Sequence, residues 1–444
     1  MSRDMTVGNP SKILFYFSLP MIVGNILQQF YSIIDSMIVG NFVGADALAA
    51  VGASYPITFV LITIANGCGI GCGVIISQYF GGKLISKVKT SIFTSIIFIT
   101  LFSFLIMIFG IIFSSSILSL MNTPKDIFEQ SCVYMKIYFW GVVFLFIYNI
   151  INSSFSALGN SKTPLLFLLL SSFLNIILDL LFVIKFQIGV IGAAYATLIS
   201  QIVSAVLGLI FLLKLLKNIH CKKTRFFDIN ILKNIFKIAV PSILQQSIVS
   251  IGNLFLQALV NSYGTIVVAG YAVAIKIDSI TILPMSNMSN AVSTFTGQNI
   301  GANKTERIKS GYKAALIMIG VFCAFITIIL FFFGYKLIGL FVNSSSNPDV
   351  IDVGFQYMKI VSLFYFFMGL MVITNGILRG SGDMKIFLVS TIANLSTRII
   401  FAYGLAFLIG QSAIWWAVPF GWIGASTISV IRYKSGKWKN KSII

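Results

Sequence analysis

The chain has 444 residues, of which 57% are hydrophobic and only 10% are charged, and it carries a formal net charge of +19. Soluble domains typically contain about 25% charged residues, so this composition excludes an ordinary soluble enzyme or binding module. Hydrophobic runs of about 20 residues recur along the whole length, which is typical of a protein that crosses a membrane many times.

Twelve membrane-spanning helices are predicted from these runs. They cover residues 12–39, 47–75, 90–116, 131–157, 163–184, 188–214, 234–261, 266–295, 310–340, 352–378, 384–408 and 411–431.

The basic residues are concentrated on one side of these spans. Of the 31 Lys and Arg residues, 24 flank spans on that side, whereas the opposite loops hold only Lys125, Lys185 and Lys336. The positive-inside rule then places both termini and the loop 215–233 in the cytoplasm. Membrane topology thus accounts for the positive charge. We expect a multi-pass protein of the cell (inner, cytoplasmic) membrane. Its surroundings would be the lipid bilayer, and we expect it not to bind nucleic acid.

The two halves of the sequence resemble each other. Four features of the first half recur 220 to 223 residues later. Pro20 recurs as Pro241, Gln78 as Gln298, Tyr134–Ile137 as Tyr357–Ile360, and Gly159 as Gly380. Six spans in each half give both halves the same orientation in the membrane. Parallel repeats of this kind are typical of transporters with a substrate site between the repeats.

The repeat predicts both the fold class and the domain organisation. We expect an all-α integral membrane protein whose twelve transmembrane helices form two six-helix parallel repeats around a central cleft. Residues 1–214 would form an amino-terminal, ion-binding lobe, 215–233 a cytoplasmic basic linker, and 234–444 a carboxy-terminal lobe.

Two aspartates lie inside the predicted spans, where acids are rare. Asp35 lies in YSIIDSMIVG and Asp179 in FLNIILDLLFVI, although only 12 of the 444 residues are acidic. A carboxylate at the centre of a bilayer costs roughly 2.5–3.5 kcal/mol on insertion scales. Such residues usually mark an ion or proton pathway, so we predict a functional role for both.

Polar side chains accompany these acids. Asn175 lies four residues before Asp179 on the same helix face, and Thr197 begins a polar stripe in the next span. Carboxylate, amide and hydroxyl oxygens suit Na⁺, and two nearby carboxylates can instead share one proton. The coupling ion would be Na⁺ or H⁺, with no other cofactor. The alternative for the polar residues is simple hydrogen bonding between helices.

The second half carries other charges inside its spans, namely Lys276, Asp278 and Arg398. A structural network and a role in substrate binding or gating are both compatible with these residues. We expect the substrate cavity to use polar and flexible side chains from both halves: Gln28, Asn253, Lys276, Asp278, Met285 and Arg398. Pro20 and Pro241 each lie inside a span, where a proline kinks the helix.

Four segments together resemble the multidrug and toxic compound extrusion family. They are DSMIVGNFVGADALAAVGAS at 35–54, ALGNSKTP at 157–164, GQNIGA at 297–302 and LRGSGD at 378–383. The major facilitator superfamily shares the six-plus-six plan, but its signature basic loop after the second span is absent. The resemblance implies a cation-coupled exporter of organic, often cationic, compounds.

The resemblance also implies roles for individual residues. Some family members bind Na⁺ or a proton at positions that correspond to Asp35, Asn175, Asp179 and Thr197. In the same pocket, Tyr134 and Asn149 correspond to residues that support these ligands without binding the ion directly. Bending of the first span at its proline would couple ion binding to the shape of the cavity.

We therefore predict a secondary active, monomeric exporter rather than an enzyme, working by alternating access on small organic cations or amphipathic molecules. The main alternative is a lipid-linked oligosaccharide flippase of the same wider superfamily, although only Lys276 and Arg398 would be available for its pyrophosphate.

An intramembrane aspartyl protease also uses two buried acids, but it carries Gly-x-Gly-Asp at one of them. Here Asp179 follows Ile-Ile-Leu. No Walker A motif is present, so direct ATP hydrolysis is not expected.

Overall fold

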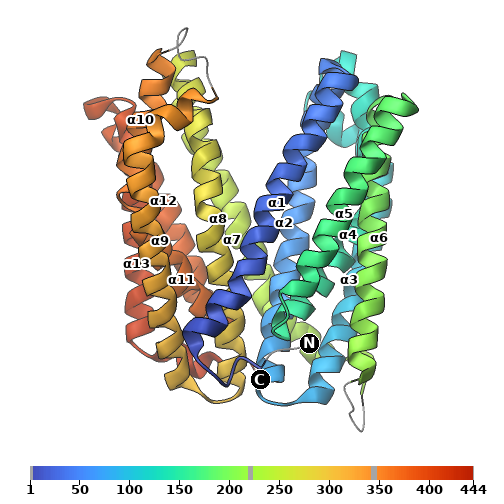
Figure 1. Cartoon of the computed structure of the whole chain (residues 1–444), viewed down its shortest axis with the longest axis vertical. Coiled ribbons are helices and arrows are strands. Elements are labelled where there is room, and N and C mark those ends of the chain that lie inside the picture. The colour runs from blue at the N-terminus through green and yellow to red at the C-terminus, as the bar shows by residue number, and fades with distance from the viewer. Residues whose placement is uncertain (1–3, 219–223, 342–347, 444) are drawn as a thin grey trace. The chain divides into compact units, whose positions relative to one another are not determined.

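The computed structural model describes residues 4–218, 224–341 and 348–443, and this part of the chain contains helices and turns but no strand. Figure 1 traces the helices in chain order. They are α1 (Pro10–Phe42), α2 (Ala45–Gly81), α3 (Ile85–Leu120), α4 (Lys125–Ala157), α5 (Lys162–Asp179) with a π-helical turn (Leu180–Lys185), α6 (Gly189–Asn218), α7 (Ile229–Asn261), α8 (Thr265–Gly301), α9 (Thr305–Gly339), α10 (Pro348–Ser362), α11 (Tyr365–Ser381), α12 (Met384–Ile409), α13 (Ser412–Lys434) and a closing 3-10 helix (Lys437–Lys441).

The all-α fold and the count of twelve spans are confirmed. Within the described residues, eleven helices are long and apolar enough to cross a membrane, and α10 with α11 forms a twelfth, bent span. Residues 219–223 of the predicted linker lie outside the described part of the chain. On either side of them α6 continues to Asn218 and α7 begins at Ile229, so both ends of the predicted linker are helical.

The chain forms two compact units whose boundaries fall inside helices. One unit contains Leu19–Ile243, and the other contains Met5–Ser18 together with Leu244–Ile444. The helix α1 therefore changes unit directly before Pro20, and α7 changes unit shortly after Pro241. The units differ from the predicted lobes in these two segments, because the amino-terminal part of each first helix packs with the other half of the sequence.

Hydrogen bonds between side chains of the second unit and the backbone of the amino-terminal segment hold this segment in place. The Met5 N–H donates to Oε1 of Gln298 at 2.8 Å, and the Arg307 guanidinium donates to the Met5 carbonyl at 3.3 Å. The Lys304 ammonium donates to the Thr6 carbonyl at 2.9 Å. Met5 itself is fully buried. Polar groups of the α8–α9 turn thus satisfy backbone groups that precede α1.

The first part of α7 is held in the first unit in a comparable way. The Asp228 N–H donates to Oγ1 of Thr94 at 3.1 Å, and the rings of Phe98 and Phe236 meet edge to face at 5.1 Å. A Cβ on Gly71 would lie 2.7 Å from the Cβ of Ala239. The small residues of α2 therefore allow α7 to approach closely.

The turns between helices repeat along with the helices. Positive φ angles recur at Gly44 and Gly264, at Lys83 and Asn303, and at Gly189 and Gly410. The predicted match of Gly159 with Gly380 needs one correction. Gly159 has a φ of 79°, and its conformational counterpart is Gly382, with a φ of 92°, whereas Gly380 lies inside α11 against the Ser293 backbone.

Each half departs from the common plan at one place. In the first half, α5 changes to a π-helical turn immediately after Asp179, while the corresponding α12 is α-helical throughout. In the second half, the tenth span bends by 55° between α10 and α11, while the corresponding α4 is unbroken. π-Turns are rare and often occur at functional sites.

Candidate ion-binding site

The two predicted acids meet inside the first unit. Asp35 comes from α1, after this helix has entered the unit, and Asp179 comes from the end of α5. Their carboxyl groups lie close enough to interact with one another electrostatically. Asp179 is fully buried, and the Oδ1 atoms of both acids are buried without a hydrogen-bond partner in the structure.

Asn175 connects Asp179 to α6. The hydrogen-bond network fixes the orientation of its amide, since Nδ2 donates to Oδ2 of Asp179 at 2.7 Å and Oδ1 accepts from the Thr197 N–H at 3.1 Å. The Thr197 hydroxyl also contacts this amide, at 3.4 Å. The spacing of four residues predicted from the sequence therefore brings Asn175 onto the acid.

Two tyrosines complete the polar cluster. Tyr31 lies one turn before Asp35 on α1, close to the side chain of Thr197 and to both acids. Tyr134, from α4, is close enough to both acids to interact with them electrostatically. Four helices thus contribute to one cluster.

A group of apolar side chains packs against this cluster at Tyr134. Ile38, Val39, Val183 and Val190 belong to one group of buried side chains, and Tyr134 packs against it. Apolar surroundings strengthen electrostatic interactions and make an unpaired charge costly. The environment therefore favours a state in which a cation or proton offsets the negative charge of the acids.

The donor set fits a monovalent cation as well as a proton. Among the described residues, no group of three His, Cys, Asp or Glu side chains could hold a metal ion. A bound Na⁺ would use the two carboxylates of Asp35 and Asp179 with neutral oxygens of Asn175, Thr197 and Tyr31, and hard cations prefer oxygen ligands. The two orphaned Oδ1 atoms are the groups such an ion would satisfy.

The sequence interpretation missed Tyr31 as a member of this cluster. Its spacing of four residues from Asp35 was the available signal. The structure places Asn149 differently from the expectation, because its amide donates to the Leu145 carbonyl of its own helix at 2.9 Å. No described contact brings Asn149 to the acids.

A second buried acid lies in the second unit. Asp278 of α8 accepts a 2.6 Å hydrogen bond from the Tyr365 hydroxyl and a longer one, 3.4 Å, from the Tyr357 hydroxyl. Arg398 attracts this carboxylate electrostatically. The salt bridges found in the described part of the chain do not include this pair. Because Tyr357 belongs to α10 and Tyr365 to α11, Asp278 ties together the two parts of the bent span.

The remaining cavity candidates differ in exposure. Gln28, Asn253 and Lys276 are exposed within their own units, as a cavity-lining role requires. Met285 has an exposed fraction of 0%, so its side chain packs inside the second unit and the prediction that it lines a cavity is wrong. Arg398 is half-buried, and its Nε atom has no hydrogen-bond partner in the structure.

Comparisons with known proteins identify the family. The sequence model of the MatE family matches residues 20–181 and 241–404, two segments that begin at Pro20 and Pro241. The "Probable multidrug resistance protein YpnP" of Bacillus subtilis is 32% identical over 98% of this chain and 97% of that protein. The "Multidrug export protein MepA" of Staphylococcus aureus is 25% identical over 92% of this chain and 90% of its own length. The chain belongs to the MatE family of multidrug and toxic compound extrusion transporters.

Solved structures agree on the fold. One is described as an outward-facing conformation of a multidrug resistance MATE family transporter; it is 24% identical, covers 98% of both chains and gives a TM-score of 0.90. A mutant form of the MATE transporter VcmN from Vibrio cholerae is 21% identical over 96% of this chain and 97% of that chain, with a TM-score of 0.88. The chain is therefore a multi-pass membrane protein with the MATE transporter fold.

Proposed function

We propose that the chain is a secondary active multidrug exporter that exchanges organic compounds for inward Na⁺ or H⁺ by alternating access. Membership in the MatE family and the names of the relatives support the export of small organic molecules. The proposed substrates are cationic or amphipathic. The exporter would act as a monomer in the cell membrane, with both termini in the cytoplasm, following the distribution of Lys and Arg.

The observation that carries the proposed exchange is the buried pair formed by Asp35 and Asp179. Asn175 occupies Oδ2 of Asp179 with a donated hydrogen bond, which leaves Oδ1 directed to other partners. Repulsion between two carboxylates in apolar surroundings is relieved when a cation binds between them. Na⁺ would also take hydroxyl oxygens from Thr197 and Tyr31, whereas a proton would be shared by the two carboxyl groups.

Transport in reconstituted vesicles tests this proposal. Purified protein is placed in liposomes, and movement of a fluorescent organic cation is followed under an imposed Na⁺ gradient or an imposed pH gradient. We expect one gradient to drive accumulation of the dye against its own gradient, and this gradient identifies the coupling ion. We expect Asp35→Asn and Asp179→Asn each to abolish gradient-driven transport, because one ionisable ligand is lost.

Asp126→Asn serves as the matched control, since Asp126 is an exposed acid in the first turn of α4. The control variant should transport like the wild type. Full gradient-driven transport by both site variants would overturn the assignment of the site. Dye movement that neither gradient affects, in the wild-type protein, would overturn the exchange mechanism.

A further inference from the structure

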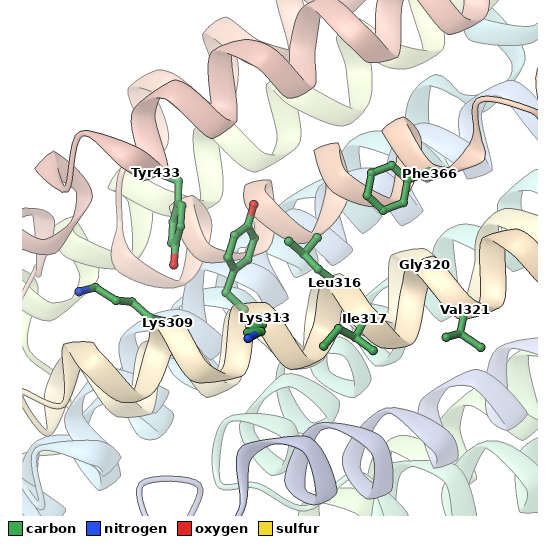
Figure 2. A pocket seen from close by; sticks show the side chains of 9 residues that line it. Lys309, Lys313, Leu316, Ile317, Gly320, Val321, Phe366 and Tyr433 are labelled. Carbon is green, nitrogen blue, oxygen red and sulfur yellow. The ribbon is translucent and has the colours of Figure 1, made fainter.

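A groove of about 670 Å³ lies on the second unit, between α9, α11 and α13. Its size falls in the range of small-molecule sites, about 300–1,000 Å³. Figure 2 shows Lys309 and Tyr433 at one end of the groove and Val321 and Phe366 towards the other. The groove contains none of the residues assigned above to ion or substrate binding.

The polar end of the groove carries a local excess of positive charge. Lys309 and Lys313 lie one turn apart on α9, and Lys439 approaches the same place. Glu306 is the acid in this cluster, with an oxygen 2.8 Å from the Lys309 ammonium and 3.8 Å from that of Lys439. The Glu306 side chain is 76% exposed, and exposed ion pairs of this kind contribute only about 0–1 kcal/mol. Glu306 thus pairs with Lys309 and Lys439, and Lys313 adds a further positive charge to the lining of the groove.

The other end of the groove is apolar and exposed. Ile317, Val321 and Phe366 are 57%, 67% and 45% exposed, and α9 shares the highest mean hydropathy among the spans, 3.0. In a bilayer such surface contacts acyl chains. The groove thus changes from basic to apolar along α9, in the same order as a phospholipid changes from headgroup to tail.

A glycine keeps the middle of the groove open. A Cβ on Gly320 would lie 3.6 Å from the ring of Phe366, an ordinary van der Waals distance. A larger side chain could therefore extend from this position without disturbing the helix backbone. In the native chain, the missing side chain leaves room for a hydrocarbon chain beside the ring.

We propose that this groove binds one anionic phospholipid, with its phosphate on Lys309 and Lys313 and one acyl chain along Ile317, Gly320 and Phe366. Basic pockets between transmembrane helices at the membrane surface are known to select anionic headgroups. The lysines also disfavour organic cations, which separates this groove from the proposed transport site. The lipid binds as a lasting surface component of the second unit.

Lipid titration of the purified, detergent-solubilised full chain tests the proposal. Native mass spectrometry measures the affinity for phosphatidylglycerol and for phosphatidylcholine. We expect the wild type to prefer phosphatidylglycerol, and the double variant Lys309→Gln/Lys313→Gln to lose about 5- to 30-fold in affinity for it, based on the usual contribution of each basic residue. Lys233→Gln/Lys237→Gln is the charge-matched control, because these lysines have the same spacing on α7 and lie outside the groove.

A second pair of variants tests the tail-binding part without any change of charge. Gly320→Leu should fill the groove and weaken binding of phosphatidylglycerol, whereas Gly404→Leu should not, because Gly404 is exposed on α12 with open space around it. Equal losses in the two lysine double variants would overturn the proposal, as would unchanged affinity in Lys309→Gln/Lys313→Gln. Unchanged affinity in Gly320→Leu would also overturn it, since the lipid would then be held without the groove.

Discussion

Asn175 is the residue that sets the hydrogen bonding of the candidate ion site. It satisfies one oxygen of Asp179 and at the same time accepts from the backbone of α6. The residue thus holds the acid-bearing end of α5 at a defined distance from Thr197. Since the second acid comes from α1, ion binding between the acids would join α1 and α5, and Asn175 connects α5 to the backbone of α6.

Replacing Asn175 by alanine should weaken the response to the coupling ion. The Asp179 carboxylate would lose the donor that positions it, and a bound Na⁺ would lose the Asn175 oxygen. A hydrogen bond to a charged group contributes about 1.5–3 kcal/mol, which corresponds to roughly 10- to 150-fold in affinity. The dependence of dye transport on the concentration of the coupling ion measures this change. Asn149→Ala is the control, because the Asn149 amide bonds to its own helix. An equal effect of both variants would contradict the role given to Asn175.

At the scale of residues, the sequence predicted those polar side chains that are unusual in the apolar segments around them. Asp35 and Asp179 could be predicted because acids are rare in apolar segments, and Asn175 followed from helical spacing. Tyr31 was missed although it lies four residues before Asp35, because most of the 16 tyrosines and 41 phenylalanines of a membrane protein are expected to pack or face lipid. Met285 was misplaced because hydrophobicity does not tell which face of α8 is buried.

The bent span is the main feature at the scale of elements. The two hydroxyl groups that meet Asp278 come from opposite sides of the bend. Next to the bend, the Thr327 hydroxyl donates to the Ser362 carbonyl at 2.7 Å. Contacts with α8 and α9 therefore stabilise a break that has no proline and no glycine between Ser362 and Tyr365.

We expect Tyr365→Phe to destabilise the protein more than Tyr357→Phe. The Tyr365 hydrogen bond is short, and a bond to a charged group contributes about 1.5–3 kcal/mol, whereas geometry at 3.4 Å is weak and should contribute less than about 1 kcal/mol. Thermal unfolding of the detergent-solubilised variants compares the two. Both variants remove one hydroxyl from a fully buried ring, so each controls for the other. Equal midpoints would show that Asp278 does not fasten the bend.

Hydropathy predicted the existence and order of the spans, because each buries an apolar length that matches a bilayer. It did not predict the bend in the tenth span or the π-turn after Asp179. The bend makes tertiary contacts with Asp278 of α8 and Thr327 of α9, and the π-turn directly follows the buried Asp179. Neither has a local signal such as proline, and each lies beside a buried carboxylate.

At the scale of the whole molecule, the main feature is that each unit contains a helix segment from the other half of the sequence. Met5–Ser18 packs in the second unit, and the beginning of α7 packs in the first. We expect residues 1–218 and 219–444, expressed separately, to aggregate or be degraded, because each piece lacks a segment that buries apolar surface in its unit. Expressed together from two reading frames, the pieces should assemble and co-purify. Size-exclusion chromatography checks both outcomes, and a stable, monodisperse single half would contradict this expectation.

The same exchange constrains how such a chain could have arisen. A single six-helix ancestor with this topology would have had no way to complete itself, since its first segment fits a second copy of the same unit. Two identical copies in the same membrane orientation could do so by exchanging these segments, as in domain-swapped dimers. Fusion of the two genes would then have joined two mutually dependent copies into a single chain.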